Sequence, residues 1–399
     1  MANRKVTVIG GGILGLSVGI ALRTYFNNIE VTIYEKELTL GIHASSRNSG
    51  VIHAGFYYSP DSLKARYCAN GNKELKELCR KHSLPIQEIG KVVVTSNIDE
   101  LERLQHLYKR GLENNIDLVL LDESKLKTFE PAARTFGQFL WSPTTAVADP
   151  FAILEQLTKN FIDLGGKIVA GKEVALRQIG NEIVASVEGN DLPTAQIVNA
   201  AGAYSAQLAQ NVGVGLEYKC LPFLGSYKVS SRNAGSPKVL IYPVPHPINP
   251  FLGAHVTLKL NGDIKIGPTA FPVIGREQYS LNSRFTFSEA ASLFQSMASL
   301  TRGREYNSFE IIRTEFPKLF TKSLVKDIEK LVPSIDQGQH WKKLQPGIRA
   351  QLVNIESGKL EQDFVVRQKE NSIHVLNAVS PGWTSALPFG RSIAKLIAT

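Results

Sequence analysis

Cysteine is scarce in this sequence. The 399 residues include three cysteines, Cys68, Cys79 and Cys220, and no Cys-x-x-Cys pair. Cys68 and Cys79 stand eleven positions apart on a predicted helix, about 16 Å from each other, which is too far for a disulfide. The sequence therefore excludes a disulfide-stabilised scaffold and favours a reducing compartment with buried thiols.

Long apolar runs and metal-ligand patterns are lacking as well. No stretch reaches the roughly 20 apolar residues of a membrane span. The opening MANRKVTVIGGG enters a predicted strand directly, so we expect a cytoplasmic protein without a signal peptide. The eight histidines include no His-x-x-x-His pair, and we expect no metal site.

Acidic residues are fewer than basic ones, 36 against 45, which gives a formal net charge of +9. Such a charge fits a nucleic acid, an anionic membrane surface or an anionic substrate as partner. The basic residues are mostly scattered among acids and form no patch interleaved with aromatics, so we expect no nucleic-acid partner. A flavin-containing nucleic-acid-binding protein is kept as a remote alternative.

A dinucleotide-binding motif opens the chain. The segment KVTVIGGGILGLSVGIALRTYFNNIEVTIYEKE predicts strand, glycine turn, helix and second strand. Gly10 permits the tight turn, Gly12 lets a pyrophosphate approach the backbone, and Gly15 allows close helix–strand packing. Glu35 ends the second strand, where its carboxylate can accept both ribose hydroxyls, and Lys36 follows it. The sequence thus predicts a dinucleotide site with the phosphates at the helix N-terminus.

Two later segments repeat the pattern of buried strand, small-residue loop and helix. They read AQIVNAAGAYSAQLA, from residue 195, and SIHVLNAVSPGWTSALPFGRSIAKLIA, from residue 372. Three such elements separated by long insertions favour a discontinuous FAD domain over an NAD domain, which is more often built in one piece. Cofactor contacts are expected from Val174, Ala201, Gly202, Pro381, Gly382, Trp383, Thr384 and Ser385.

The remaining segments predict an antiparallel sheet. Alternating apolar runs punctuated by Pro and Gly fill residues 219–278, and LNGDIKI predicts a hairpin. DELERLQHLYKRGLEN predicts an amphipathic helix with Leu101, Leu104 and Leu107 on one side. We assign 1–86, 146–216 and 341–399 to a cofactor domain, and 87–145 and 217–340 to a substrate domain.

The whole chain resembles the FAD-dependent oxidoreductases of the D-amino-acid oxidase superfamily, and most closely the L-2-hydroxyglutarate dehydrogenases/oxidases. The segments that carry the resemblance are SSRNSGVIHAGFYY, PFLGAH with IGPTA, GIRAQL with QDF, and HVLNAVSP with TSALPFG. It implies an α/β and α+β fold, a Rossmann-like FAD-binding domain with a smaller antiparallel-sheet substrate domain. It also implies oxidation of a short L-2-hydroxy acid, with L-2-hydroxyglutarate as the leading candidate and 2-oxoglutarate as its product.

Several positions depart from the family pattern. After LPF, the family usually carries Arg-Gly-Glu-Tyr, where this chain has Leu224 followed by Gly-Ser-Tyr. Gly382 and Trp383 stand where small alanines are usual, and Thr269 replaces an asparagine. These departures bear on the identity of the substrate.

The segment SSRNSGVIHAGFYY lies beside the flavin ring in the family. Its serines suit phosphate or ribityl oxygens, and its first glycine lets the backbone lie close to the ring. A neutral imidazole is suited to take the hydroxyl proton while hydride leaves for flavin N(5), so His53 is the expected base. The cofactor contacts expected here are Ser45, Ser46, Asn48, Ser49 and Gly50.

A substrate with carboxylates requires cations and phenols. Arg47, Tyr57, His255 and Arg349 are the expected substrate-binding residues, because guanidinium binds carboxylate bidentately. No cysteine lies in the last loop, so we expect the FAD to be non-covalent. An amino-acid or amine oxidase and a glycerol-3-phosphate-type dehydrogenase remain alternative functions. The electron acceptor is left open between oxygen and a quinone.

A stripe of lysines raises the question of membrane contact. PKLFTKSLVKDIEKLV predicts a helix with lysines at 318, 322, 326 and 330, and an apolar face beside them. A basic amphipathic helix is typical of proteins that lie in a membrane interface. We therefore consider peripheral attachment at the inner face of the cytoplasmic membrane. The apolar face comprises Phe320, Leu324, Val325, Ile328 and Leu331.

Overall fold

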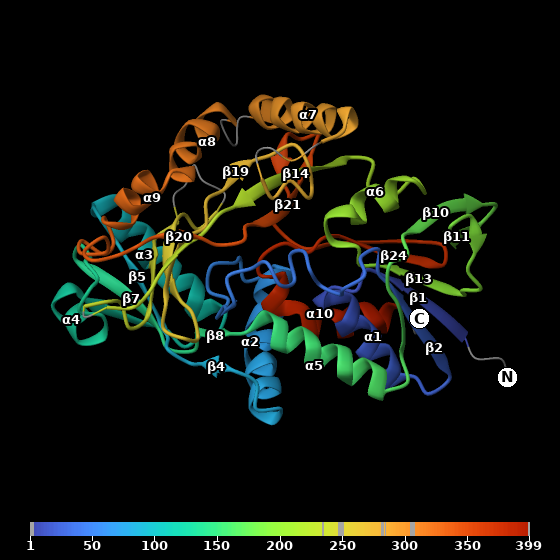
Figure 1. Ribbon diagram of the computed structural model, residues 1–399, viewed down its shortest axis with the longest axis horizontal. Coiled ribbons are helices and arrows are strands. Elements are labelled where there is room, and N and C mark those ends of the chain that lie inside the picture. Colours follow the sequence, from blue (N-terminus) through green and yellow to red (C-terminus); the bar gives the residue numbers. More distant parts are fainter. Residues whose placement is uncertain are drawn as a thin grey trace.

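The computed structural model describes residues 4–233, 235–245, 251–280, 283, 285–303 and 308–397. A six-stranded sheet occupies one end of the molecule, and an eight-stranded sheet lies at the opposite end (Figure 1). The predicted fold class is confirmed, with a parallel Rossmann-like sheet and largely antiparallel sheets combined in one chain. Within the described residues, none of the helices is both long and apolar enough to span a bilayer.

The six-stranded sheet is centred on β1 (Arg4–Ile9), which is parallel to β2 (Ile29–Tyr34) and to β13 (Gln196–Asn199). β1 and β13 lie far apart in sequence, so the sheet forms only when the predicted segments come together. The outer strands are the parallel β9 (Lys167–Val169), the parallel β24 (Ser372–Asn377) and the antiparallel β23 (Val365–Lys369).

Helices cover one face of this sheet and a small sheet covers the other. Buried apolar side chains of α1, such as Leu16 and Leu22, join those of α10 and α5 in one core. The covering helices are α1 (Ile13–Tyr25), α2 (Leu63–Lys81), α5 (Pro150–Asp163) and α10 (Gly382–Leu396). On the other face lie β10 (Val174–Ile179), β11 (Glu182–Val187), β12 (Asn190–Asp191), η2 (Gly202–Tyr204) and α6 (Ser205–Gln210).

The eight-stranded sheet is built almost entirely from antiparallel neighbours, as predicted. One pair, β16 with β5, is parallel. The predicted hairpin joins β17 to β18 with Gly262 at φ +86°. In sheet order the strands are β20 (Lys342–Lys343), β15 (Lys228–Ser230), β18 (Ile264–Gly267), β17 (His255–Leu258), β16 (Leu240–Pro243), β5 (Lys91–Val94), β7 (Gln138–Ser142) and β6 (Val119–Asp122).

Two smaller sheets, of four and three strands, and the remaining helices complete the described fold. β21 (Gly347–Asn354), from the predicted cofactor segments, pairs along its whole length with β14 (Tyr218–Gly225), from the predicted substrate segments. The two predicted domains therefore share a sheet, and the domain boundaries stay a prediction. The other elements are β3 (Val51–Ile52), β4 (Ile86–Gln87), β8 (Ala146–Ala148), β19 (Phe271–Pro272), β22 (Lys359–Leu360), α3 (Ile98–Glu113), η1 (Glu123–Lys125) and α4 (Leu126–Phe129).

The stretch with the lysine stripe does not form the helix expected from sequence. It folds as η3 (Pro317–Leu319) and α9 (Thr321–Ile328), which follow α7 (Phe287–Gly303) and α8 (Ser308–Glu315). The side chains of Leu324, Val325, Ile328 and Leu331 are buried in the core beside the eight-stranded sheet, because that sheet needs an apolar cover. This face is therefore not available to a membrane, and the membrane interpretation of the helix is wrong in that respect.

Candidate functional site

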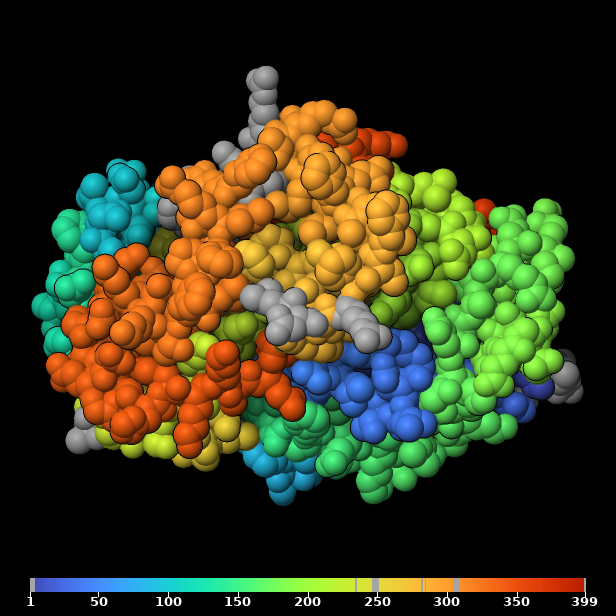
Figure 2. Space-filling view, turned by 45° about the horizontal axis from the view of Figure 1, so that its top comes forward, coloured from blue at the N-terminus to red at the C-terminus, as the bar shows by residue number. Residues whose placement is uncertain are grey.

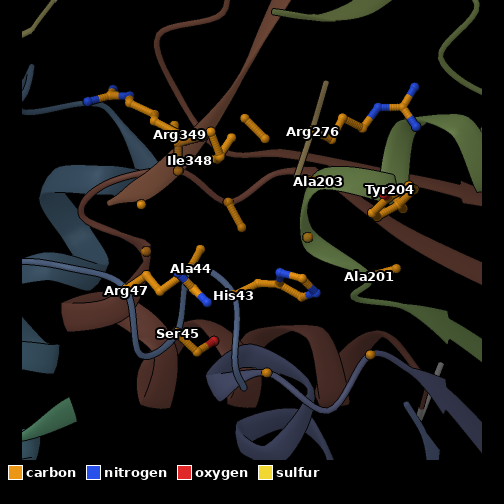
Figure 3. A pocket seen from close by; sticks show the side chains of 18 of the residues that line it. His43, Ala44, Ser45, Arg47, Ala201, Ala203, Tyr204, Arg276, Ile348 and Arg349 are labelled. Atoms are coloured by element: carbon orange, nitrogen blue, oxygen red, sulfur yellow. The ribbon is translucent and has the colours of Figure 1, made fainter. Parts of the chain in front are cut away.

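A cavity of about 1200 Å³ runs between the two large sheets. Its walls come from segments far apart in the chain (Figure 3). His43, Ser45 and Arg47 follow β2, Tyr204 follows β13, and Arg349 lies on β21. A cavity of this volume, lined by segments of both large sheets, can hold a dinucleotide together with a small substrate.

The glycine turn forms the cofactor end of this cavity. Gly10 has φ +108°, and a Cβ there would lie 2.5 Å from the carbonyl oxygen of Ala200. A Cβ on Gly12 would lie 2.9 Å from Ser45 Oγ, and one on Gly15 would lie 1.9 Å from the Gly10 oxygen. The three glycines therefore have the packing that a phosphate-binding turn requires.

Glu35 lies at the end of β2 beside this turn. Its Oε2 accepts a hydrogen bond from the Gly11 N–H at 2.8 Å, and its Oε1 accepts one from the Glu37 N–H at 3.0 Å. Ser45 Oγ accepts from the Ile13 N–H at 3.0 Å, in the first turn of α1. These contacts hold a carboxylate and a hydroxyl where a ribose and phosphates would bind.

Lys36 clamps the cofactor segment to the loop after β19. Its Nζ lies 2.5 Å from carboxylate oxygens of both Glu37 and Glu277. Burial acts to lower the pKa of Lys36, but the hydrogen bonds to Glu277 and Glu37 outweigh it and raise that pKa. Among the described residues, Glu37, His43 and Glu277 form the group whose ligand atoms come within 4.8 Å of one another. Because the Lys36 ammonium already contacts both carboxylates, this group is a network of ion pairs.

His53 lies at the opposite end, directly after β3. Its backbone N–H donates to Thr384 Oγ1 at 3.2 Å, and its carbonyl accepts from Asn72 Nδ2 at 3.0 Å. The imidazole is buried and its Nδ1 has no hydrogen-bond partner among the described residues. Burial, helped by Lys91 and His255, lowers the pKa of His53 to about 3. The backbone is thus fixed, while the imidazole is neutral and available.

His255, on β17, brings a second imidazole to the same end. Its Nδ1 bonds the Gly253 carbonyl oxygen at 2.8 Å, so Nδ1 carries the proton and Nε2 is an acceptor. That Nε2 is buried without a partner in the described structure. Burial, aided by Lys91 and Lys265, lowers the pKa of His255 to about 3, although the bond to Gly253 opposes this shift.

The two predicted arginines differ in their surroundings. Arg349 lies over the ring of Phe251 at 4.4 Å, and its Nε donates to Gln351 Oε1 at 3.3 Å. Burial lowers the pKa of Arg349 to about 10. Arg47 is occupied structurally, since its Nε donates to the Ile42 carbonyl oxygen at 2.8 Å and its guanidinium lies on the Tyr279 ring. Arg349 is therefore the arginine better placed to receive a ligand.

Most of the predicted site residues are brought together by the fold. Those that line the cavity are Gly10, Gly12, Glu35, Lys36, Ser45, Arg47, Asn48, Ser49, His53, Val174, Ala201, Gly202, His255, Arg349, Pro381, Gly382, Trp383 and Thr384. Those outside its lining are Gly15, Ser46, Gly50, Tyr57 and Ser385. Gly15 packs against the turn, Gly50 accepts a hydrogen bond from the Ala148 N–H through its carbonyl, and Tyr57 is partly buried with its hydroxyl oxygen enclosed.

The departures from the family pattern occupy different places. Leu224 does not line the cavity and packs with Val273 and Ile348 in a small apolar cluster. Its neighbours in β14, Phe223 and Gly225, face the cavity instead. Thr269 does line it, and its hydroxyl donates to the Leu224 carbonyl oxygen at 2.9 Å. The Leu224 side chain therefore contributes nothing to the cavity lining.

Sequence reasoning missed a group of buried residues on the eight-stranded sheet. Lys91, Tyr242 and Lys265 stand on three of its strands, close to His53 and His255. A lysine that begins the apolar run KVVV was the available signal for Lys91, since a charge inside a buried strand is rare.

Comparison with known proteins adds independent findings. The family model described as FAD dependent oxidoreductase matches residues 5–396. L-2-hydroxyglutarate dehydrogenase of Indibacter alkaliphilus is 36% identical over 98% of both chains. The Escherichia coli K12 protein of the same name is 31% identical over 98% of this chain and 92% of its own. The mitochondrial L-2-hydroxyglutarate dehydrogenase of Bos taurus is also 31% identical, over 98% and 87% respectively.

Solved structures support the fold. The FAD-bound L-alpha-glycerophosphate oxidase of Mycoplasma pneumoniae superimposes with a TM-score of 0.78 at 23% identity, covering 100% of this chain and 96% of that one. Glycine oxidase from Geobacillus kaustophilus gives a TM-score of 0.74 at 17% identity, covering 99% and 95%. Both likenesses extend over the complete architecture.

Proposed function

The chain belongs to the family of FAD dependent oxidoreductases, and from this premise we propose that it oxidises L-2-hydroxyglutarate to 2-oxoglutarate. The bound FAD would supply the acceptor for the hydride that leaves C2 of the substrate. The observation that carries the proposal is that two neutral imidazoles, of His53 and His255, line the same cavity as the partly buried Arg349. Three relatives that cover nearly the whole chain bear the matching name.

The residues present fit FAD. The turn at Gly10 and Gly12 leaves no room for side chains, so phosphates can reach the N-terminus of α1. Glu35 would bind the ribose, and backbone of the loop before α10 would meet the flavin. We infer non-covalent attachment because the three cysteines are buried and none lines the cavity. Acid or heat should release free FAD, and flavin that stays on the denatured chain would contradict this inference.

Residues of the chain would have separate roles in the reaction, one in substrate binding and one in proton transfer. Arg349 binds a carboxylate through its planar guanidinium and fixes the orientation of C2. A neutral His53 takes the proton from the hydroxyl oxygen as C2 loses its hydride, so the C–O bond becomes a carbonyl. Burial of the site keeps water away from the proton acceptor.

Two other functions are distinguished by substrate. An amino-acid oxidase presents a neutral amine and has less need of a base, and glycine oxidase shares the fold. A glycerol 3-phosphate enzyme requires a phosphate site, and a glycerophosphate oxidase also shares the fold. The presence of two acceptor imidazoles favours a hydroxyl over an amine.

An anaerobic spectrum tests these functions directly. The purified yellow protein is mixed without oxygen with L-2-hydroxyglutarate, D-2-hydroxyglutarate, L-lactate, L-glutamate or glycerol 3-phosphate, and flavin absorbance is followed. L-2-hydroxyglutarate should bleach the flavin fastest. Bleaching by L-glutamate or glycerol 3-phosphate, with none by L-2-hydroxyglutarate, would overturn the proposal and leave only the family.

We further propose peripheral contact with an anionic membrane, with a membrane quinone as electron acceptor. The α7–α9 stretch spreads over one area of the surface (Figure 2). The support is that this stretch carries several exposed phenylalanine rings. Phe287, Phe294 and Phe320 are 91%, 80% and 60% exposed. Lys322 and Lys326 are exposed on α9 in the same stretch. Aromatic rings with neighbouring cations suit a lipid interface.

A further inference from the structure

One face of the eight-stranded sheet presents polar side chains to the substrate end of the cavity. Lys265 stands opposite Thr257 in the β17–β18 pair, and Tyr242 lies beside His255 at the β16–β17 pair. β16 and β5 are parallel in register, which places Lys91 on the same face as Tyr242. Strands far apart in sequence thus place Lys265, His255, Tyr242 and Lys91 on one face of the sheet, with Lys265 and Lys91 in one cross-strand row and His255 and Tyr242 in the adjacent row.

Lys91 lies on this face inside a cage of three rings. Its Nζ is 4.5 Å from the ring centre of Phe56, 4.6 Å from that of Tyr57 and 4.7 Å from that of Tyr242. The side chain has no solvent exposure, and Nζ has no hydrogen-bond partner among the described residues. Ring faces stabilise an ammonium, but they replace neither hydration nor a counter-ion.

Two further cations are Lys265, which is buried, and Arg349, which is partly buried and lines the cavity. Lys265 donates from Nζ to the Ser49 carbonyl oxygen at 2.6 Å and lies over Tyr227. Arg349 donates to an amide oxygen of Gln351. Within the described part of the chain, no acidic side chain forms an ion pair with Lys91, Lys265 or Arg349.

Unsatisfied polar atoms collect in the same region. His53 Nδ1, Tyr57 Oη, Lys91 Nζ and His255 Nε2 are all buried and lack partners in the described structure. An isolated buried polar group typically destabilises a protein by about 1–3 kcal/mol, so a cluster of them needs a functional reason. A ligand that brings several negatively charged oxygens would satisfy the positive side of this cluster.

We propose that Lys91, Lys265 and Arg349 form a cationic shell that selects dianionic over monoanionic substrates, with Lys91 as the residue that sets this preference. Arg349 holds the carboxylate next to the reacting carbon. Lys91 and Lys265 act electrostatically from behind the imidazoles on the second carboxylate. This inference rests on the proposed function in placing the substrate at this end of the cavity.

The groups that face Lys91 supply no negative charge. They are His53 and Tyr57 from the segment after β3, Cys68 from α2, and Tyr242 and His255 from the sheet. Burial raises the pKa of the Cys68 thiol to about 12, and it raises the pKa values of both tyrosines. The imidazoles are neutral because their pKa values lie near 3. Near neutral pH, the negative charge must therefore come from the ligand.

The binding of a negatively charged ligand is consequently linked to the protonation of Lys91 and Lys265. Burial lowers the pKa of Lys91 to about 7 and that of Lys265 to about 7. A dianion bound nearby favours the ammonium form and raises both pKa values again. Binding at pH 7.5 should therefore take up protons, and a dianion should cause more uptake than a monoanion.

The test uses the FAD-loaded protein with two ligands that lack an oxidisable hydroxyl. Glutarate carries two carboxylates and butyrate carries one. Their binding is measured from changes in the flavin spectrum, and proton uptake is measured by calorimetry in buffers of different ionisation enthalpy. Lys91→Met should weaken glutarate binding by about tenfold or more and reduce proton uptake, while butyrate binding stays within about twofold. Lys343→Met, at an exposed lysine of the same sheet, is the matched control and should change neither.

Several results would overturn the inference. Equal losses for glutarate and butyrate, unchanged glutarate binding, or no proton uptake by the unmodified protein would each do so. Lys91→Arg keeps the charge and should retain the preference for glutarate. If Lys91→Met does not retain FAD, Lys265→Met is tested instead. It should likewise weaken glutarate binding and reduce proton uptake, with butyrate binding nearly unchanged. Charge-dependent glutarate binding without flavin reduction by L-2-hydroxyglutarate would reject the proposed function and leave the cationic shell standing.

Discussion

The imidazole of His255 stacks on the ring of Tyr242, with ring centroids 3.7 Å apart and planes inclined by 17°. The ring is therefore held from its face by a neighbouring strand and from its edge by the Gly253 carbonyl. In the described structure, Nδ1 of the buried His53 imidazole has no hydrogen-bond partner. We propose that the held ring of His255 orients the substrate and that His53 takes the proton.

The two histidines should respond differently to substitution. His53→Ala should lower the rate of anaerobic flavin reduction by about two to four orders of magnitude, because the proton acceptor is lost. FAD should stay bound, since the backbone of His53 makes the bond to Thr384. His255→Asn keeps a donor and an acceptor and should mainly raise KM. A near-normal reductive rate in His53→Ala would remove His53 from the mechanism.

The pH dependence of kcat/KM offers a second test of the base. The pKa of His53 is lowered to about 3, so the imidazole is already neutral throughout the range where an ordinary histidine would titrate. The acid limb should thus lie well below pH 6, and the profile should show no step near 6.5. A step near 6.5 that disappears in His53→Ala would contradict the buried, neutral assignment.

Acid stability depends on a third buried histidine. His374 is bonded to Asn199 at 3.2 Å and Ser372 at 2.8 Å, and burial lowers its pKa to about 4. Between about pH 6.5 and 4, the unfolded chain binds a proton here that the folded chain does not. The free energy of unfolding should therefore fall as pH falls through this window, by about 1.4 kcal/mol per pH unit for such a group.

Denaturant titrations at several pH values measure this slope. His374→Gln should make the loss of stability toward acid shallower, whatever its effect at pH 7. His106→Gln, at an exposed histidine of α3, should leave the slope unchanged. Identical slopes in all three proteins would show that His374 takes no part in the acid response.

Arg349 and Arg47 make a matched pair for substrate recognition. Arg349→Lys keeps the charge but loses the planar fork, and it should raise KM for L-2-hydroxyglutarate by about tenfold or more. Arg47→Lys should raise KM less, because the guanidinium of Arg47 is already bound to backbone carbonyls. Steady-state kinetics with both variants decides between them, and a larger effect at Arg47 would reverse the assignment.

Local spacing predicted the cofactor end of the site. Gly10, Gly12, Gly15 and Glu35 fall within one strand–turn–helix–strand unit, so their positions follow from neighbouring residues in the chain. The segment at His53 was found through its unusual composition and the family resemblance. Lys91 was not found, because its contact with Tyr242 depends on the pairing of β5 with β16.

The lysine stripe shows a different limit of sequence reasoning. Amphipathicity predicted an apolar face around Leu324 and Ile328, and that face exists. Sequence alone did not determine whether membrane or sheet covers it, and α9 packs on β18. The sequence around Phe287 and Phe294 shows no comparable periodic pattern of basic residues. The exposure of these two rings was therefore not predicted.

The proposed membrane contact through Phe287 and Phe294 has a definite mutational signature. Phe287 and Phe294 lie seven residues apart on α7, so both project from nearly the same side of the helix. Replacing both by serine should weaken binding to vesicles that contain anionic lipid, because less apolar surface enters the interface. Phe151→Ser, at a ring 58% exposed on α5, is the control and should bind normally.

The charges of the same surface are tested separately. Lys322→Glu with Lys326→Glu should weaken vesicle binding further at low salt and should lose that effect at high salt, since screening removes the attraction to lipid headgroups. Vesicle co-sedimentation measures both sets of variants, and the anaerobic reductive rate should stay unchanged because these residues lie outside the cavity. Equal vesicle binding by the original protein, the serine variant and the glutamate variant would leave the phenylalanine surface without a membrane role. Reoxidation by a vesicle-embedded quinone should slow in parallel with the loss of binding.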